Sequence, residues 1–108
     1  MISQRILSLM GIAKKANKLV SGQDVVERQI KANKIYLVIL SKDATYNTKK
    51  KFNSMCVKNN IPIIFWGKSE ELSKAIGKES SKVFGIIDEG FARELRKQID
   101  IFNGGGVY

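Results

Sequence analysis

The chain has 108 residues, and its 19 lysines and arginines outnumber its 10 aspartates and glutamates to give a formal net charge of +9. This length suits one compact domain with a single core. Apolar residues make up 44% and charged residues 27%, which excludes a disordered or collagen-like chain. The longest apolar run, Ile35 to Leu40, is far shorter than the roughly 20 residues that cross a membrane as a helix, so we expect no membrane association.

The residue types that are missing exclude several chemistries. The chain has no histidine and one cysteine, Cys56, so it can form neither an internal disulfide nor a zinc site built from cysteine and histidine. Serine or cysteine nucleophiles activated by histidine are excluded for the same reason. We expect no catalytic residues, no metal and no cofactor, although enzymes that use carboxylates or lysine alone remain open.

The N-terminal segment indicates where the protein resides. Lys14 and Lys15 follow the apolar stretch of residues 6–13, where small residues would mark the cleavage site of a secretory signal. We therefore expect a cytoplasmic protein. A mitochondrial presequence is the alternative, because the residues before Asp24 include basic but no acidic side chains.

The positive charge is concentrated in one part of the sequence. Residues 1–60 hold twelve basic and three acidic residues, whereas residues 61–108 hold seven of each sign. Such an excess predicts a polarised surface that attracts a polyanion, and nucleic acid is the leading candidate. The alternative is that the charge serves solubility alone.

The first part of the chain predicts two helices and two strands. Apolar positions that step by three and four indicate an amphipathic helix over residues 3–16. Residues 19–20 can form a very short strand, and a second helix opens at Ser21-Gly22 and runs to about residue 34. Residues 35–40 are β-branched, aromatic or leucine throughout, which is typical of a strand buried on both faces.

The middle of the chain predicts a helix and another strand. A helix over residues 46–60 would place Phe52, Met55 and Cys56 on one face, so Cys56 is interpreted as a core residue. Residues 61–66 are predicted to form a second buried strand, with Pro62 tolerated near its start.

The last part predicts two capped helices around one strand. Ser69 is expected to cap a short helix that ends in a left-handed turn at Gly77. A strand over residues 82–87 follows, and Asp88 is expected to cap the last helix, which runs to residue 102. Strands that alternate with helices at this spacing predict an α/β layered domain.

The clearest candidate site is a cluster of cationic and polar side chains around the start of the second helix. Its members are Lys14, Lys15, Lys18, Gly22, Gln23, Asp24 and Arg28. A helix that starts at Gly22 has free backbone N–H groups in its first turn, which can bind a phosphate or a base edge. Gln23 can donate and accept hydrogen bonds, whereas an ionised Asp24 only accepts, which suits the N–H edge of guanine. The alternative is that Ser21 or Asp24 merely caps the helix.

Two other short stretches have features of phosphate binding. The run of lysines at residues 49–51 opens the third helix, and Lys49 is our candidate for a phosphate contact, with a solvated helix face as the alternative. Gly67-Lys68-Ser69 resembles the end of a phosphate-binding loop, but the glycine that such a loop needs five residues earlier is Pro62.

Several different short motifs are distributed along almost the whole chain, between about residues 6 and 99. They are Gly11-Ile12-Ala13-Lys14-Lys15-Ala16, Ser21-Gly22, residues 37–44, residues 47–51, Cys56 with Ile61-Pro62, residues 72–78 and residues 88–92. In this order and spacing they resemble the kink-turn-binding ribosomal protein family, the L7Ae family, and particularly its small bacterial YlxQ-like branch.

The resemblance implies a fold and a function. The fold would be a three-layer α-β-α sandwich with a four-stranded mixed sheet. The protein would be no enzyme but would bind a sharply bent RNA helix that contains tandem sheared G·A pairs. The start of the second helix would read the guanines, and a loop before the last strand would cover an extruded nucleotide. Carried over, the reading residues are Gly22, Gln23, Asp24 and Arg28, and the covering loop consists of Lys78, Glu79, Ser80 and Ser81 with Lys82 beside it.

Two places depart from the family pattern. Asp24-Val25 stands where typical kink-turn binders have Asn-Glu, and the covering loop is polar where theirs is usually apolar. Taken together, the sequence predicts a monomeric RNA-binding domain over residues 1–102 that recognises a kinked or internally looped RNA. A flexible glycine-rich tail over residues 103–108 is expected to follow this domain. A non-specific basic module for nucleic acid and a small α/β enzyme for an anionic metabolite are the rival hypotheses.

Overall fold

Five helices surround one small sheet in the computed structural model, which describes residues 2–78 and 80–103. In chain order the elements are α1 (Ile2–Lys15), β1 (Leu19–Ser21), α2 (Gln23–Lys31), β2 (Leu37–Leu40), α3 (Tyr46–Lys58), β3 (Ile63–Phe65), α4 (Ser69–Ala75), β4 (Val83–Ile86) and α5 (Glu89–Phe102). Glu79 and all but the first residue of the expected tail lie outside the described residues.

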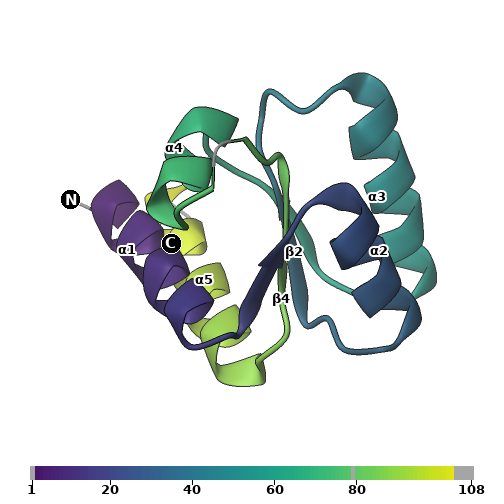
Figure 1. Ribbon diagram of the computed structural model, residues 1–108, viewed down its shortest axis with the longest axis horizontal. Coiled ribbons are helices and arrows are strands. Elements are labelled where there is room, and N and C mark those ends of the chain that lie inside the picture. The colour runs from purple at the N-terminus through teal and green to yellow at the C-terminus, as the bar shows by residue number, and fades with distance from the viewer. Residues whose placement is uncertain (1, 79, 104–108) are drawn as a thin grey trace.

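The sheet lies between two layers of helices. Its strand order is β1-β4-β2-β3, in which β4 runs antiparallel to both neighbours and β2 runs parallel to β3. Helices α1, α4 and α5 cover one face, and α2 and α3 cover the other (Figure 1). The expected three-layer α-β-α sandwich with a four-stranded mixed sheet is thereby confirmed. None of the helices within the described ranges is long and apolar enough to cross a membrane.

Strand β2 divides its side chains between two cores. Leu37 and Ile39 pack with the α1, α4 and α5 layer, whereas Val38 and Leu40 pack with the α2 and α3 layer. All four are fully buried, as expected for a strand covered on both faces. The strand is shorter than the expected residues 35–40, and Tyr36, which precedes it, is 48% exposed. Cys56 lies in the second core, as predicted, and burial raises the pKa of its thiol to about 11.

The strand expected over residues 61–66 is present but shorter, and the expectation that it is buried is wrong. Strand β3 has only three residues and lies at the edge of the sheet, where Phe65 is 39% exposed. A continuous apolar run shows that a strand contacts a core but does not show whether one or two strands flank it. The sequence pattern therefore overestimated the burial of β3.

The predicted N-terminal cap is confirmed for α5 but not for α4. The Asp88 carboxylate accepts a hydrogen bond from the backbone N–H of Phe91 at 2.9 Å, so this predicted cap is confirmed. The predicted cap at Ser69 is wrong. The Asp43 carboxylate, in the loop after β2, accepts hydrogen bonds from the Ser69 backbone N–H at 2.9 Å and from its hydroxyl at 2.6 Å. These bonds hold the pKa of Asp43 well below its usual range.

Replacing Asp43 by alanine should destabilise the fold by about 1 kcal/mol at neutral pH, the usual cost of losing a helix cap. Because the pKa of Asp43 is lowered in the folded state, its contribution is present above the ordinary aspartate pKa and is lost as the pH falls below it. Urea unfolding of both proteins at several pH values measures this difference. A difference that stays constant between neutral pH and about pH 3 would contradict the role of the ionised carboxylate.

Candidate nucleic-acid interface

Two segments that are far apart in the sequence meet at one hollow on the surface. Gly22 and Gln23, at the start of α2, line it together with Ser80, Ser81 and Lys82, which precede β4. The hollow has a volume of about 230 Å³. The structure thus brings two of the residues expected to read the guanines next to part of the expected covering loop.

Hydrogen bonding at the end of β1 fixes this arrangement. The Gly22 backbone N–H donates to the Val83 carbonyl at 3.0 Å, just beyond the point where Ser21 pairs with Phe84. Since β1 leads directly into α2, the pairing of β1 with β4 determines where α2 begins. The start of the helix therefore lies beside the loop that leads into β4.

The start of α2 has no side-chain cap. Gly22 occupies the N-cap position with φ 99° and ψ 146°, and neither Ser21 nor Asp24 caps the helix, so the capping alternative is wrong. The first hydrogen bond of the helix joins the Val26 N–H to the Gly22 carbonyl at 3.0 Å. The N–H groups of residues 23–25 come before Val26 in the chain and have no partner within the helix. They are therefore available to an acceptor at the N-terminal end of α2.

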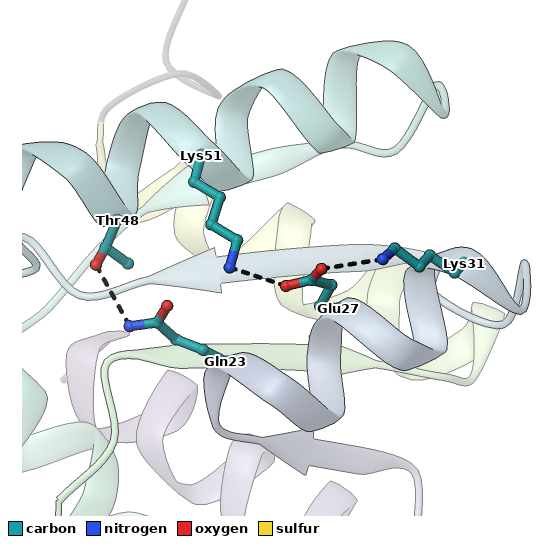
Figure 2. Close-up of polar contacts among 5 residues, drawn as sticks. All are labelled: Gln23, Glu27, Lys31, Thr48 and Lys51. Atoms are coloured by element: carbon teal, nitrogen blue, oxygen red, sulfur yellow. Dashed lines mark hydrogen bonds and ion pairs between the residues drawn. The ribbon is translucent and has the colours of Figure 1, made fainter.

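Gln23 is anchored by a residue that the sequence did not indicate. Its side-chain amide donates to the Thr48 hydroxyl at 3.4 Å, across the gap between α2 and α3 (Figure 2). Thr48 is held in turn by Thr45, whose hydroxyl oxygen accepts from the Thr48 backbone N–H at 3.2 Å. The spacing of Thr45 and Thr48 is a recognisable cap signal, but no local signal places Thr48 against Gln23.

A second link between α2 and α3 reduces the positive charge beside the site. Glu27 forms ion pairs with Lys51 at 2.9 Å and with Lys31 at 3.1 Å (Figure 2). Hydrogen bonds from Lys51 and then Lys31 hold the pKa of Glu27 below its usual value. Arg28, by contrast, is exposed and has no ion pair with any described residue. Glu27 thus partly neutralises two lysines, while the charge of Arg28 remains available to an anionic ligand.

The predicted lysines do not all gather around the start of α2. Lys14 and Lys15 lie in the last turn of α1, and the carbonyl of Lys18 accepts from the Ile87 N–H at 2.9 Å. Gly22, in contrast, bonds to Val83 at the first residue of β4, whereas Ile87 directly follows the last residue of β4. Four steps along a strand amount to roughly 13 Å. These three lysines therefore lie at the opposite end of β1 from the hollow, whereas Lys82 lines it and Lys49 directly follows Thr48.

The covering loop is held by a buried hydroxyl. Ser73 is 1% exposed. Its hydroxyl oxygen accepts a hydrogen bond from the Ser81 N–H at 2.7 Å, and its hydroxyl O–H donates to the Ser81 carbonyl at 3.0 Å. The Lys78 N–H donates to the Ser73 carbonyl at 2.8 Å, while the Lys78 side chain is exposed. Glu79, also predicted for this loop, lies outside the described residues. Ser73 thus fixes the position of Ser81 beside the start of α2.

The site offers hydrogen-bond donors, acceptors and positive charge. In the part of the chain that the structure describes, no three acidic, cysteine or histidine side chains are close enough to hold a metal ion. The arrangement of helix amides, an exposed carboxylate at Asp24 and cations around it is suited to binding a polyanion and contacting its polar groups.

Gly22→Ala should destabilise the protein by about 1–3 kcal/mol, because residues other than glycine rarely adopt this backbone conformation. A Cβ atom at Gly22 would meet nothing within 4 Å, so the expected cost comes from the backbone and not from a clash. Chemical denaturation measures the change. A variant as stable as the parent chain would show that α2 can begin without this conformation.

Comparisons with known proteins identify the family of the chain. The model of the ribosomal protein L7Ae/L30e/S12e/Gadd45 family matches residues 4–96. The RNA-binding protein YlxQ of Bacillus subtilis is 37% identical over 92 residues, which cover 85% of this chain and 92% of that protein.

Two solved structures share the fold. A protein of unknown function from Bacillus halodurans has a TM-score of 0.85 and 40% identity, and the match covers 88% of this chain and 96% of that one. The Giardia lamblia 15.5kD RNA binding protein has a TM-score of 0.75 at 18% identity, covering 95% of this chain and 88% of that one, and shows the fold alone. The family match over most of the chain confirms the resemblance seen in the sequence, and the chain belongs to the ribosomal protein L7Ae/L30e/S12e/Gadd45 family.

Proposed function

We propose that this chain is an RNA-binding protein, not an enzyme, and that it recognises a kinked or internally looped RNA at the hollow between α2 and the loop before β4. The observation that carries the proposal is that Gly22 and Gln23 share this hollow with Ser80, Ser81 and Lys82. The name of the Bacillus subtilis relative, an RNA-binding protein, supports it. We assign the activity to a single domain over residues 1–102 that acts as a monomer.

The start of α2 supplies the contacts that distinguish bases. The exposed Asp24 carboxylate accepts hydrogen bonds from the N–H edge of a guanine, and the free amides of residues 23–25 donate to oxygen atoms of the RNA. The Gln23 side chain, which donates to the Thr48 hydroxyl at 3.4 Å, offers its amide group to a base edge beside Asp24. Val25 is half-buried and cannot accept a hydrogen bond from guanine, so Asp24 bears more of the discrimination here than in typical kink-turn binders.

Cationic side chains hold the RNA backbone on either side of the hollow. In this proposal Arg28, Lys49 and Lys82 contact phosphates near the bent segment, and Lys78 adds a further contact along the covering loop. The exposure of Arg28, Lys78 and Lys82 supports this assignment. Lys14, Lys15 and Lys18, at the other end of β1, contact a flanking part of the same RNA. About five phosphate contacts from these seven side chains predict a log-log salt dependence of affinity with a slope of roughly −3 to −5.

Arg28→Ala and Asp24→Ala should affect binding in different ways. Arg28→Ala removes a phosphate contact, so it should weaken binding to every RNA to a similar extent and reduce the salt slope by about 0.7–0.9. Asp24→Ala removes a base contact, so the preference for an RNA with tandem G·A pairs over one with these pairs replaced should fall about tenfold. Titrations of both RNAs at several salt concentrations measure the two effects.

These titrations also separate the proposal from its rivals. If Arg28→Ala lowered discrimination and Asp24→Ala lowered affinity uniformly, the division of roles would be refuted. Equal affinity for a straight duplex and a kinked RNA would favour a non-specific basic module. Thermal stabilisation by a nucleotide or phosphate ester, with no binding of RNA, would instead favour an enzyme that acts on an anionic metabolite.

Glu27→Gln should increase the affinity for RNA. The substitution removes a negative charge and releases Lys31 and Lys51 to interact with phosphates, so the salt slope should become steeper by about one to two units. Glu89→Gln is a matched control, because Glu89 also forms an i,i+4 ion pair, with Arg93 at 4.0 Å, but lies on α5 in the other helical layer. Equal effects of both substitutions would mean that Glu27 acts only through the net charge.

A further inference from the structure

A second surface lies at the edge of the sheet opposite to the candidate RNA interface. Strands β1 and β3 form the two edges, and a groove of about 540 Å³ runs between β3 and α5. We call it the β3–α5 groove and define it by six of the residues that line it. These are Ile63, Ile64, Arg93, Arg96, Lys97 and Asp100.

The outer edge of β3 presents unpaired backbone groups. The Pro62 carbonyl accepts from the Val38 N–H at 3.0 Å, and the Trp66 N–H donates to the Leu40 carbonyl at 2.9 Å, so even-numbered residues of this segment face β2. Backbone groups alternate in direction along a strand. The N–H and C=O groups of Ile63 and Phe65 therefore point away from the sheet, where no other strand of the described chain pairs with them.

The helical wall of the groove is cationic. Arg93, Arg96 and Lys97 follow one another at the spacing of one helix face, and all three are exposed. Among the residues that the structure describes, Asp100 is the single carboxylate that lines the groove. Arg93 has a loose ion pair with Glu89 at 4.0 Å, whereas Arg96 and Lys97 have no ion pair among the described residues.

We propose that the β3–α5 groove binds an acidic, extended segment of another protein, which adds to the sheet as a strand beside β3. Backbone hydrogen bonds to Ile63 and Phe65 set its register, and alternate carboxylate side chains meet Arg96 and Lys97. The half-buried Ile63 and Ile64 side chains provide apolar contacts. The proposal does not depend on whether the chain binds RNA.

The same groups disfavour two other occupants. The phosphates of an RNA only accept hydrogen bonds, so the outward carbonyls of Ile63 and Phe65 would repel them, whereas a peptide supplies N–H groups to those carbonyls. In a symmetric dimer formed through β3, Arg96 and Lys97 of one copy would approach the same cations of the other. The like charges would oppose that pairing.

The test uses the whole chain and a fluorescent peptide of about eight residues, within the usual length of a strand, that alternates glutamate with valine. Fluorescence anisotropy measures its affinity, and amide chemical shifts show where it binds. We expect saturable binding with shifts at the amides of Ile63 and Phe65. A peptide that alternates lysine with valine should bind at least about tenfold more weakly, a difference of roughly 1.4 kcal/mol.

Two variants separate the charge from the backbone. Arg96→Glu with Lys97→Glu should weaken binding of the acidic peptide at least about tenfold. Lys34→Glu with Lys50→Glu makes the same charge change at exposed lysines after α2 and in α3, which do not line the groove, and should have little effect. Phe65→Pro removes one outward N–H and is compatible with an edge strand, so it should also weaken binding. A peptide N-methylated at alternate amides tests the same hydrogen bonds without altering the protein.

Several results would overturn the proposal. The acidic peptide could fail to bind, could bind equally well to both charge-reversed proteins, or could bind equally well after N-methylation. A short single-stranded RNA that shifted the Ile63 and Phe65 amides and displaced the peptide would identify a nucleic-acid site instead. Self-association that is abolished by Phe65→Pro, detected by analytical ultracentrifugation, would identify a second copy of the chain as the occupant.

Discussion

The pairing of β1 with β4 is the constraint on which the candidate RNA interface depends. Strand β1 has only three residues, and Gly22 follows it directly, so the ladder to β4 sets the position of the first turn of α2. The same β4 is preceded by Ser81 and Lys82, and Ser73 holds Ser81 in place. One antiparallel pairing therefore positions both sides of the hollow, and a shift of its register would separate them.

Much of the fold could be predicted because its main signals are local. The apolar run of residues 35–40 indicated a strand covered on both faces, which the structure has at Leu37–Leu40, and Asp88 indicated the start of α5. The errors concern contacts between distant residues. Ser69 has the residue type of a cap, yet Asp43 performs that role from the loop after β2. Strand β3 has the composition of a core strand, yet only the sheet topology shows that it lies at an edge.

The same distinction applies to the candidate site. Motif spacing indicated Gly22 and the covering loop, and the chain topology brings them together. Thr48 and Ser73 lie within motifs of the family resemblance, but their role at the site is not predictable from them, because each acts through a hydrogen bond to a distant residue. Lys18 was grouped with Gly22 because they are close in sequence. An extended strand separates such residues by roughly 13 Å, whereas a helix would separate them by about 6 Å.

The second half of the sequence has balanced charge but still forms a cationic surface. Residues 61–108 have no net charge, yet α5 gathers Arg93, Arg96 and Lys97 on one face beside β3. That face and the start of α2 lie at opposite edges of a four-stranded sheet, which spans roughly 14 Å from edge strand to edge strand. This exceeds the Debye length of about 8 Å at physiological ionic strength. An acidic peptide at one edge would therefore hardly weaken the attraction of a polyanion to the other, and the fold is suited to holding both at once.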